Sequence, residues 1–224
     1  MGVTKRTSKL IVLLSLAGAL GACTSGGDDA VDPLPDSGKA PCDGDYPDTS
    51  TGNVVPCITF TGYARPAEGT GETHRIEVST ADFYNPTGEE TYGPGSSFGE
   101  GEPRPKALLI NGSALWCNPC KNEAAQHLPG EYAELHPRGM EFMVIVVESA
   151  HIGEPASFDD LDSWIDSFAV DYPAVLDPVN QLGLDTETFP ANILVDTSDM
   201  TVVEEVKGIP QDSFWAKAEE LVGE

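Results

Sequence analysis

Two cysteines separated by two residues are the feature of this sequence best suited to chemistry. Cys117 and Cys120 follow a continuous apolar run, 107–111, and precede a stretch with helix-forming character. A helix N-terminus stabilises a thiolate through its free N–H groups and its dipole, and the thiolate is the attacking species in disulfide exchange. We therefore expect Cys117 to be the nucleophile and Cys120, one helical turn later, to resolve the mixed disulfide. Pro119 suits the first helical turn and stiffens the loop between the cysteines.

A Cys-x-x-Cys pair can also be half of a zinc site. Zinc needs two further ligands, which usually form a second close pair. Cys42 and Cys57 are fifteen residues apart, and the four histidines show no ligand spacing. We therefore expect a redox-active pair with no metal and no bound cofactor. Cys42 and Cys57 are interpreted as a structural disulfide, which for a loop of about 15 residues stabilises the fold by about 3 kcal/mol.

The elements that must hold the cysteines follow an α/β pattern. The run at 107–111 is typical of a strand buried on both faces, and a second apolar run, 141–147, follows at the distance of a right-handed βαβ unit. The helical stretch between them, from 117 to about 135, should be kinked or split at Pro129-Gly130. The rest of the pattern predicts a helix from Ser157 or Asp159, an antiparallel hairpin over 191–206 and a helix over 211–222. Together these features predict a mixed central sheet flanked by helices.

The segment before the first strong strand has a different composition. Residues 41–105 are rich in glycine and proline, with short β-like runs at 54–60 and 75–78. We expect them to add β segments to the sheet rather than to form a separate domain. The predicted domain then spans 41–224, with its core at 106–224.

The N-terminal 22 residues have the pattern of an export signal. Three basic residues precede an apolar run, 10–20, that is too short to span a membrane. The run ends in Leu20-Gly21-Ala22-Cys23, which resembles the lipobox of bacterial lipoproteins and implies a lipid on Cys23. The alternative is ordinary signal-peptide cleavage, with Cys23 incidental. Residues 23–40 have almost no large apolar side chain, which predicts a disordered acidic tether.

Charge limits the partners of the chain. It carries 37 acidic and 12 basic residues, a formal net charge of -25, and loss of the three basic residues in 1–22 would make it -28. Such a surface repels nucleic acid and anionic headgroups, so we expect no nucleic-acid partner and membrane contact only through the lipid. Ser25 stands at the second mature position, where Asp would signal inner-membrane retention, and this favours the outer membrane in a bacterial envelope.

Around the cysteines the chain resembles a family of extracytoplasmic thioredoxin-like proteins typified by TlpA and ResA. The resemblance covers roughly residues 76–222. It rests on four features: the Trp-Cys-x-Pro-Cys motif at 116–120, Asn111, Glu123 three residues after Cys120, and Thr188-Phe189-Pro190. The resemblance implies a thioredoxin-like α/β fold with extra N-terminal β segments.

The resemblance also implies roles for these residues. Asn111 cannot exchange a proton near neutral pH, so Glu123 would be the acid–base group if burial raises its pKa. The alternative for Glu123 is a solvated carboxylate on a helix face. Pro190 would be cis, facing the cysteines and exposing the backbone of Phe189 for pairing with a substrate. Trp116 would pack over the motif and shield the second cysteine.

The implied activity is thiol–disulfide exchange on exported proteins. The direction would be reduction, with electrons from a membrane donor. The stretch 112–115 departs from the family, which usually has aromatic residues there, and we expect a smaller, more open active-site surface. One alternative is a thiol peroxidase of the peroxiredoxin type, but its signature needs Pro and Thr where this chain has Ile110 and Ala114. Another is a non-catalytic thioredoxin-fold binding lipoprotein with a permanently oxidised pair.

Overall fold

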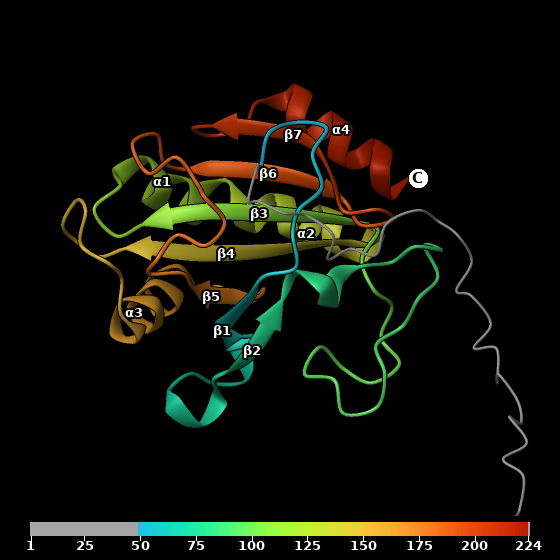
Figure 1. The fold of residues 1–224 in the computed structure, drawn as a ribbon, viewed down its shortest axis with the longest axis horizontal. Helices are drawn as coiled ribbons and strands as arrows, with labels where there is room; N and C mark the ends of the chain where they lie inside the picture. The colour runs from blue at the N-terminus through green and yellow to red at the C-terminus, as the bar shows by residue number, and fades with distance from the viewer. Residues whose placement is uncertain (1–48, 224) are drawn as a thin grey trace, which may run out of the picture. The chain divides into compact units, whose positions relative to one another are not determined.

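The computed structural model of the chain describes residues 49–223 (Figure 1). The expected signal over 1–22, the lipidation site Cys23 and the tether over 23–40 lie outside the described residues. No helix within the described range is long and apolar enough to cross a membrane.

A seven-stranded mixed sheet forms the centre of the described domain, with the strand order β2-β1-β5-β4-β3-β6-β7. β3, β4 and β5 are parallel, whereas β6 and β7 on one side and β1 and β2 on the other pair antiparallel. The strands are β1 (Thr59–Tyr63), β2 (Ile76–Ser79), β3 (Ala107–Ala114), β4 (Met140–Glu148), β5 (Ala174–Leu176), β6 (Ala191–Asp196) and β7 (Thr201–Lys207). The predicted α/β class with a mixed central sheet is confirmed.

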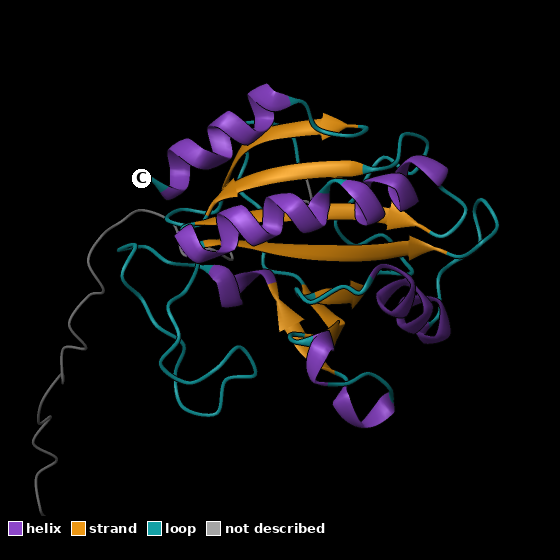
Figure 2. Cartoon of the chain, turned by 180° about the vertical axis from the view of Figure 1, so that it is seen from behind, coloured by secondary structure: helices purple, strands orange, loops and turns teal. Residues whose placement is uncertain are grey.

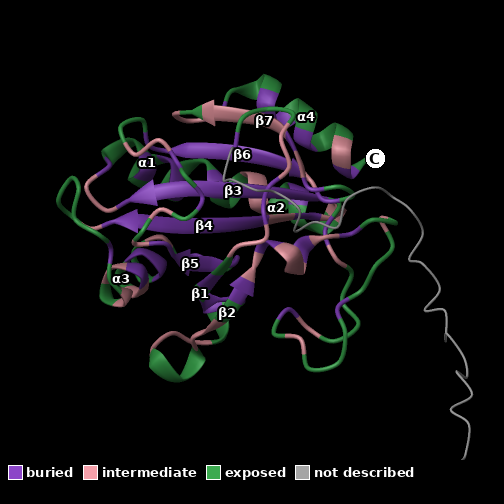
Figure 3. Cartoon of the chain, in the orientation of Figure 1, coloured by how far each residue is buried: buried purple, intermediate pink, exposed green. Residues whose placement is uncertain are grey.

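The two strands next to the cysteine motif are the most buried part of the sheet. β3 is buried at every position and β4 at all but one, as the purple strands of Figure 3 show. β3 lies between β4 and β6, so its backbone groups are paired on both sides. An apolar run with no polar alternation is what such a position requires, because both faces of the strand are covered.

Helices α1, α2 and α4 lie on the face of the sheet turned to the viewer in Figure 2. Tyr132 of α2 and Trp215 of α4 both pack against Phe142 of β4, with ring centroids 5.2 and 6.1 Å away. α3 contacts β5 and α1. The helices are α1 (Asn118–Gln126), α2 (Leu128–Leu135), α3 (Phe158–Phe168) and α4 (Asp212–Val222), and 3-10 turns cover Pro66–Glu68, Glu72–His74, Thr80–Phe83 and His136–Arg138.

Two helix boundaries lie where the sequence predicts them. The helix between β3 and β4 is split, as predicted, with Pro129 in the first turn of α2, where its missing N–H costs nothing. Ser157 is the N-cap of α3. Its hydroxyl accepts a hydrogen bond from the N–H of Asp160, and the Asp160 carboxylate accepts one from the N–H of Ser157 at 2.8 Å.

The segment before β3 builds one edge of the sheet. β1 begins at Thr59 and not at Val54, where the β-like run starts. Val54 forms an isolated bridge with Thr201 of β7, so the chain crosses the front of the sheet in Figure 1 before β1 begins. The Tyr63 hydroxyl of β1 donates to Asp162 of α3 at 2.5 Å, which ties this edge to the core.

Cys57, two residues before β1, is disulfide-bonded. Its predicted partner, Cys42, lies outside the described residues. The pairing of these two cysteines therefore stays a prediction.

Candidate active site

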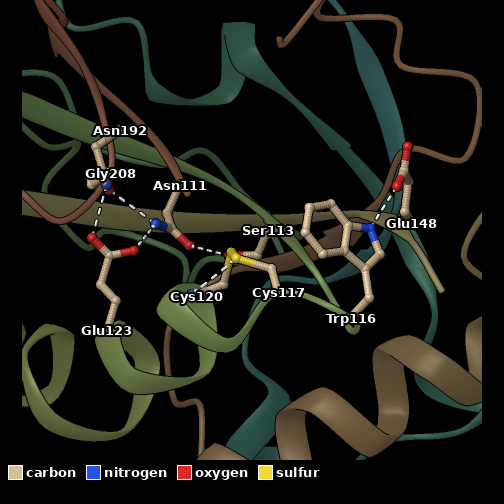
Figure 4. Close-up of a disulfide and its surroundings, with 9 residues drawn as sticks. All are labelled: Asn111, Ser113, Trp116, Cys117, Cys120, Glu123, Glu148, Asn192 and Gly208. Atoms are coloured by element: carbon tan, nitrogen blue, oxygen red, sulfur yellow. Dashed lines mark hydrogen bonds between the residues drawn. A yellow bond between two sulfur atoms is a disulfide. The ribbon is translucent and has the colours of Figure 1, made fainter. Parts of the chain in front are cut away.

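The cysteine pair lies where β3 ends and α1 begins. Cys117 is the N-cap of α1, with φ -78° and ψ 105°, and its Sγ accepts a hydrogen bond from the backbone N–H of Cys120 at 3.1 Å. The two residues form a disulfide with a Cα–Cα distance of 5.3 Å (Figure 4). Pro119 occupies the first turn of the helix. The predicted strand-to-helix setting of the motif is confirmed.

We expected a more open active-site surface from the small residues at 112–115, but both cysteines of the disulfide are buried. Cys117 is 1% exposed and Cys120 0%. A Cβ placed on Gly112 would overlap the Leu184 side chain and lie 3.4 Å from the Phe189 ring. Side chains that are distant in the sequence therefore occupy the space that a larger residue at 112 would need.

Glu123 is buried beneath the motif. Its side chain projects from α1 one turn after Cys120, and the residue is 0% exposed. Burial raises its pKa, and hydrogen bonds from Asn111 and Asn192 oppose that effect, leaving the pKa at about 7. The interpretation as a solvated helix-face carboxylate is wrong, because packing against β3 and β6 removes the carboxyl from water.

Two asparagine amides hold the Glu123 carboxylate. Asn111 Nδ2 donates to Glu123 Oε2 at 2.8 Å, and Asn192 Nδ2 donates to Oε1 at 2.8 Å. Asn111 Nδ2 also donates to Asn192 Oδ1 at 2.9 Å, and the Ser113 hydroxyl donates to Asn111 Oδ1 at 2.8 Å. Figure 4 shows this network beside the disulfide. Each carboxylate oxygen therefore faces an N–H donor in a buried site.

Trp116 is held from the end of β4. Its indole N–H donates to Glu148 Oε2 at 2.6 Å, and the backbone N–H of Gly153 donates to the same oxygen at 3.0 Å. The Trp116 ring lies 6.4 Å from the Phe189 ring, centroid to centroid. These contacts set the orientation of Trp116 next to the motif, and its shielding of Cys120 stays a prediction.

Sequence reasoning missed Asn192, Ser113 and Glu148. A signal existed for Asn192, since it is a polar residue inside the apolar run 191–195, where an amide needs partners. Glu148 ends a buried strand and offered a similar hint. The sequence does not show which groups these three side chains contact in the folded protein.

Comparison with known proteins identifies the fold that carries this site. No protein-family model matches the sequence, and no curated protein matches it. Solved structures do match. The thioredoxin domain of a thiol-disulfide oxidoreductase from Bacteroides vulgatus gives a TM-score of 0.51 at 20% identity, covering 78% of this chain and 99% of that chain. A secreted thiol-disulfide isomerase from Corynebacterium glutamicum gives 0.51 at 18% identity, covering 75% and 85%. A thiol:disulfide interchange protein from Bacteroides sp. gives 0.50 at 19% identity, covering 77% and 90%.

The chain has a thioredoxin fold. In this thioredoxin fold the Phe189–Pro190 peptide bond is cis, as the resemblance implied. The carbonyl of Pro190 accepts a hydrogen bond from the N–H of Gly208 at 2.7 Å, which fixes the segment against the end of β7.

The arrangement brings together the groups that thiol–disulfide exchange needs. One sulfur lies at a helix N-terminus, a second lies one turn later, and a buried carboxyl with a pKa of about 7 follows on the same helix. A thiolate at Cys117 would be stabilised by the hydrogen bond from the backbone N–H of Cys120 and by the helix dipole. The carboxyl can both bind and release a proton near neutral pH.

Proposed function

We propose that this protein is a thiol–disulfide oxidoreductase that reduces disulfides of exported proteins through Cys117 and Cys120. The observation that carries the proposal is the position of this disulfide at the start of α1 in a thioredoxin fold. In a helix N-cap the ionised form of Cys117 gains charge-assisted hydrogen bonding that a free thiol lacks. Solved structures similar to this chain include a secreted thiol-disulfide isomerase, and this supports the same class of reaction for the present protein.

The reaction divides into two exchanges. In the reduced protein the Cys117 thiolate attacks one sulfur of a substrate disulfide, an S–S bond forms between them, and the other substrate sulfur leaves and takes a proton from water. Cys120 then loses its proton, attacks the sulfur of Cys117, and releases the second substrate thiolate. The substrate gains two electrons, and the Cys117–Cys120 disulfide forms.

Glu123 is proposed to handle the proton of Cys120. With a pKa of about 7, its carboxylate accepts the Cys120 proton as the resolving thiolate forms. The same proton then passes to the departing substrate thiolate. Asn111, which lies beside it, has no proton to exchange in this range.

The compartment and the electron source belong to the same proposal. The export signal and lipobox-like run at 20–23 would place the domain outside the cytoplasm on a lipid anchor, with outer-membrane attachment favoured. In an oxidising compartment the pair would remain a disulfide. A membrane donor must therefore return two electrons in each cycle.

Two substitutions test the assignment of the sulfurs. The Cys120→Ser variant should accumulate mixed disulfides between Cys117 and exported proteins, because the resolving thiol is missing. Cys117→Ser should lose insulin-disulfide reduction, since the nucleophile is gone. Asn122→Ala, an exposed change on the same helix, serves as the matched control and should retain activity. Normal insulin reduction by folded Cys117→Ser would refute the proposal.

A further inference from the structure

Asn192 occupies a central position in the buried network beneath the disulfide. It lies on β6 directly opposite Asn111 of β3 in the antiparallel register, and its side chain is buried. Cross-strand partners in such a register project from the same face of the sheet. Here that face meets α1, which carries Glu123.

The hydrogen bonds of Asn192 determine which way both amides point. The Gly208 carbonyl can only accept, so the Asn192 group facing it at 3.1 Å must be the N–H donor, Nδ2. The opposite atom, Oδ1, must then accept from Asn111, which directs the Asn111 amide nitrogen toward Glu123 as well. Both carboxylate oxygens consequently face donors.

The same residue links Glu123 to the segment of Pro190. Gly208 accepts from Asn192 through its carbonyl and donates to the Pro190 carbonyl through its N–H, at 3.1 and 2.7 Å. Asn192 is the second residue of β6, and Pro190 lies immediately before that strand. The carboxyl and the segment beside it therefore share one anchor at the end of β7.

We propose that Asn192 is a positioning residue, which orients both amide donors at Glu123 and joins this carboxylate to the Pro190 segment. The inference deepens the proposed function, because Glu123 is the group proposed there to take the proton of Cys120. The role of Asn192 in catalysis rests on that function, whereas its positioning of the Glu123 carboxylate does not.

Few titratable groups of residues 49–223 face Glu123. β3 and β6 present the neutral amides, and α1 itself places Cys120 one turn away. From the segment between α3 and β5, Tyr172 interacts electrostatically with Glu123, and burial and then this charge raise the Tyr172 pKa, so the phenol stays neutral near pH 7. Amide donors are thus the main groups on the described chain that favour the ionised carboxyl against burial.

The test is a direct titration of the Glu123 carboxyl by 13C NMR in the oxidised protein. Asn192→Leu keeps the branched arrangement of the side-chain heavy atoms and removes both the donor and the orienting contacts. The midpoint should therefore rise by about one pH unit or more, a tenfold increase in proton affinity. Ser113→Ala is the matched control. It removes the outermost hydrogen bond but leaves both donors in place, and the midpoint should move by no more than a few tenths of a pH unit.

Asn192→Asp is a second variant of nearly identical shape. It places a second carboxyl next to Glu123, so the upper of the two coupled midpoints should rise above that of the parent. The inference is overturned if a folded Asn192→Leu or Asn192→Asp protein shows the parent midpoint, or if Ser113→Ala moves it as far. Titration of the disulfide form needs no turnover, so these outcomes are independent of whether Cys117→Ser loses activity.

Discussion

The stability of this protein should depend on pH through one buried carboxyl. Glu123 is fully buried, and its pKa in the folded protein is raised to about 7 from an ordinary value of 4.5. An acid that holds its proton more tightly when folded stabilises the fold below pH 4.5, and this contribution is lost as the pH rises to 7. At about 1.4 kcal/mol for each pH unit, the change amounts to about 3 kcal/mol.

Replacement of Glu123 by Gln removes this dependence. The variant loses some stability at all pH values, because its amide N–H meets an amide donor of Asn111 or Asn192. The free energy of unfolding of the wild type should nevertheless fall by about 3 kcal/mol relative to that of Glu123→Gln between about pH 4.5 and pH 8.

Urea unfolding followed by the fluorescence of the three tryptophans measures this difference at a series of pH values. Taking the difference between two proteins cancels the titration of the other acidic residues. Glu134→Gln, an exposed change on α2, is the control and should keep the wild-type pH dependence. If the wild-type and Glu123→Gln curves run parallel from pH 4.5 to 8, the burial argument for Glu123 is wrong.

Three further substitutions test individual contacts of the fold, one at the site and two elsewhere in the domain, each by its free energy of unfolding in urea. Gly62→Ala should cost about 3 kcal/mol, because its Cβ would overlap the carbonyl oxygen of Ala174 across the β1–β5 pairing. Trp116→Phe should cost about 1–3 kcal/mol by removing a hydrogen bond to Glu148, which is 9% exposed. Asn85→Ala should cost about 2–4 kcal/mol, because its side chain binds three backbone groups of the loop before β3. A loss below 0.5 kcal/mol at any of these positions would contradict the contact assigned to it.

Some of the fold was predictable because its signals are short-range. The run at 107–111 had no polar alternation, which placed β3 in the middle of the sheet. The cap at Ser157 and the split near Pro129 depend on groups within one helical turn. By contrast, β5 has only three residues, too few for a periodic pattern, and it was missed. The start of β1 was misplaced because pairing with β5, distant in the sequence, decides where that strand begins.

The sequence by itself determined the position of the cysteine pair: two cysteines, the strand before them, and the helix start that places Cys117 at an N-cap. These follow from neighbouring residues. Only the tertiary structure decided the state of Glu123, because its burial and its two amide donors come from β3 and β6, and Asn111 and Asn192 are 81 residues apart in the chain. Desolvation and hydrogen bonding act through space, so a pKa near 7 arises only when the helix packs onto the sheet.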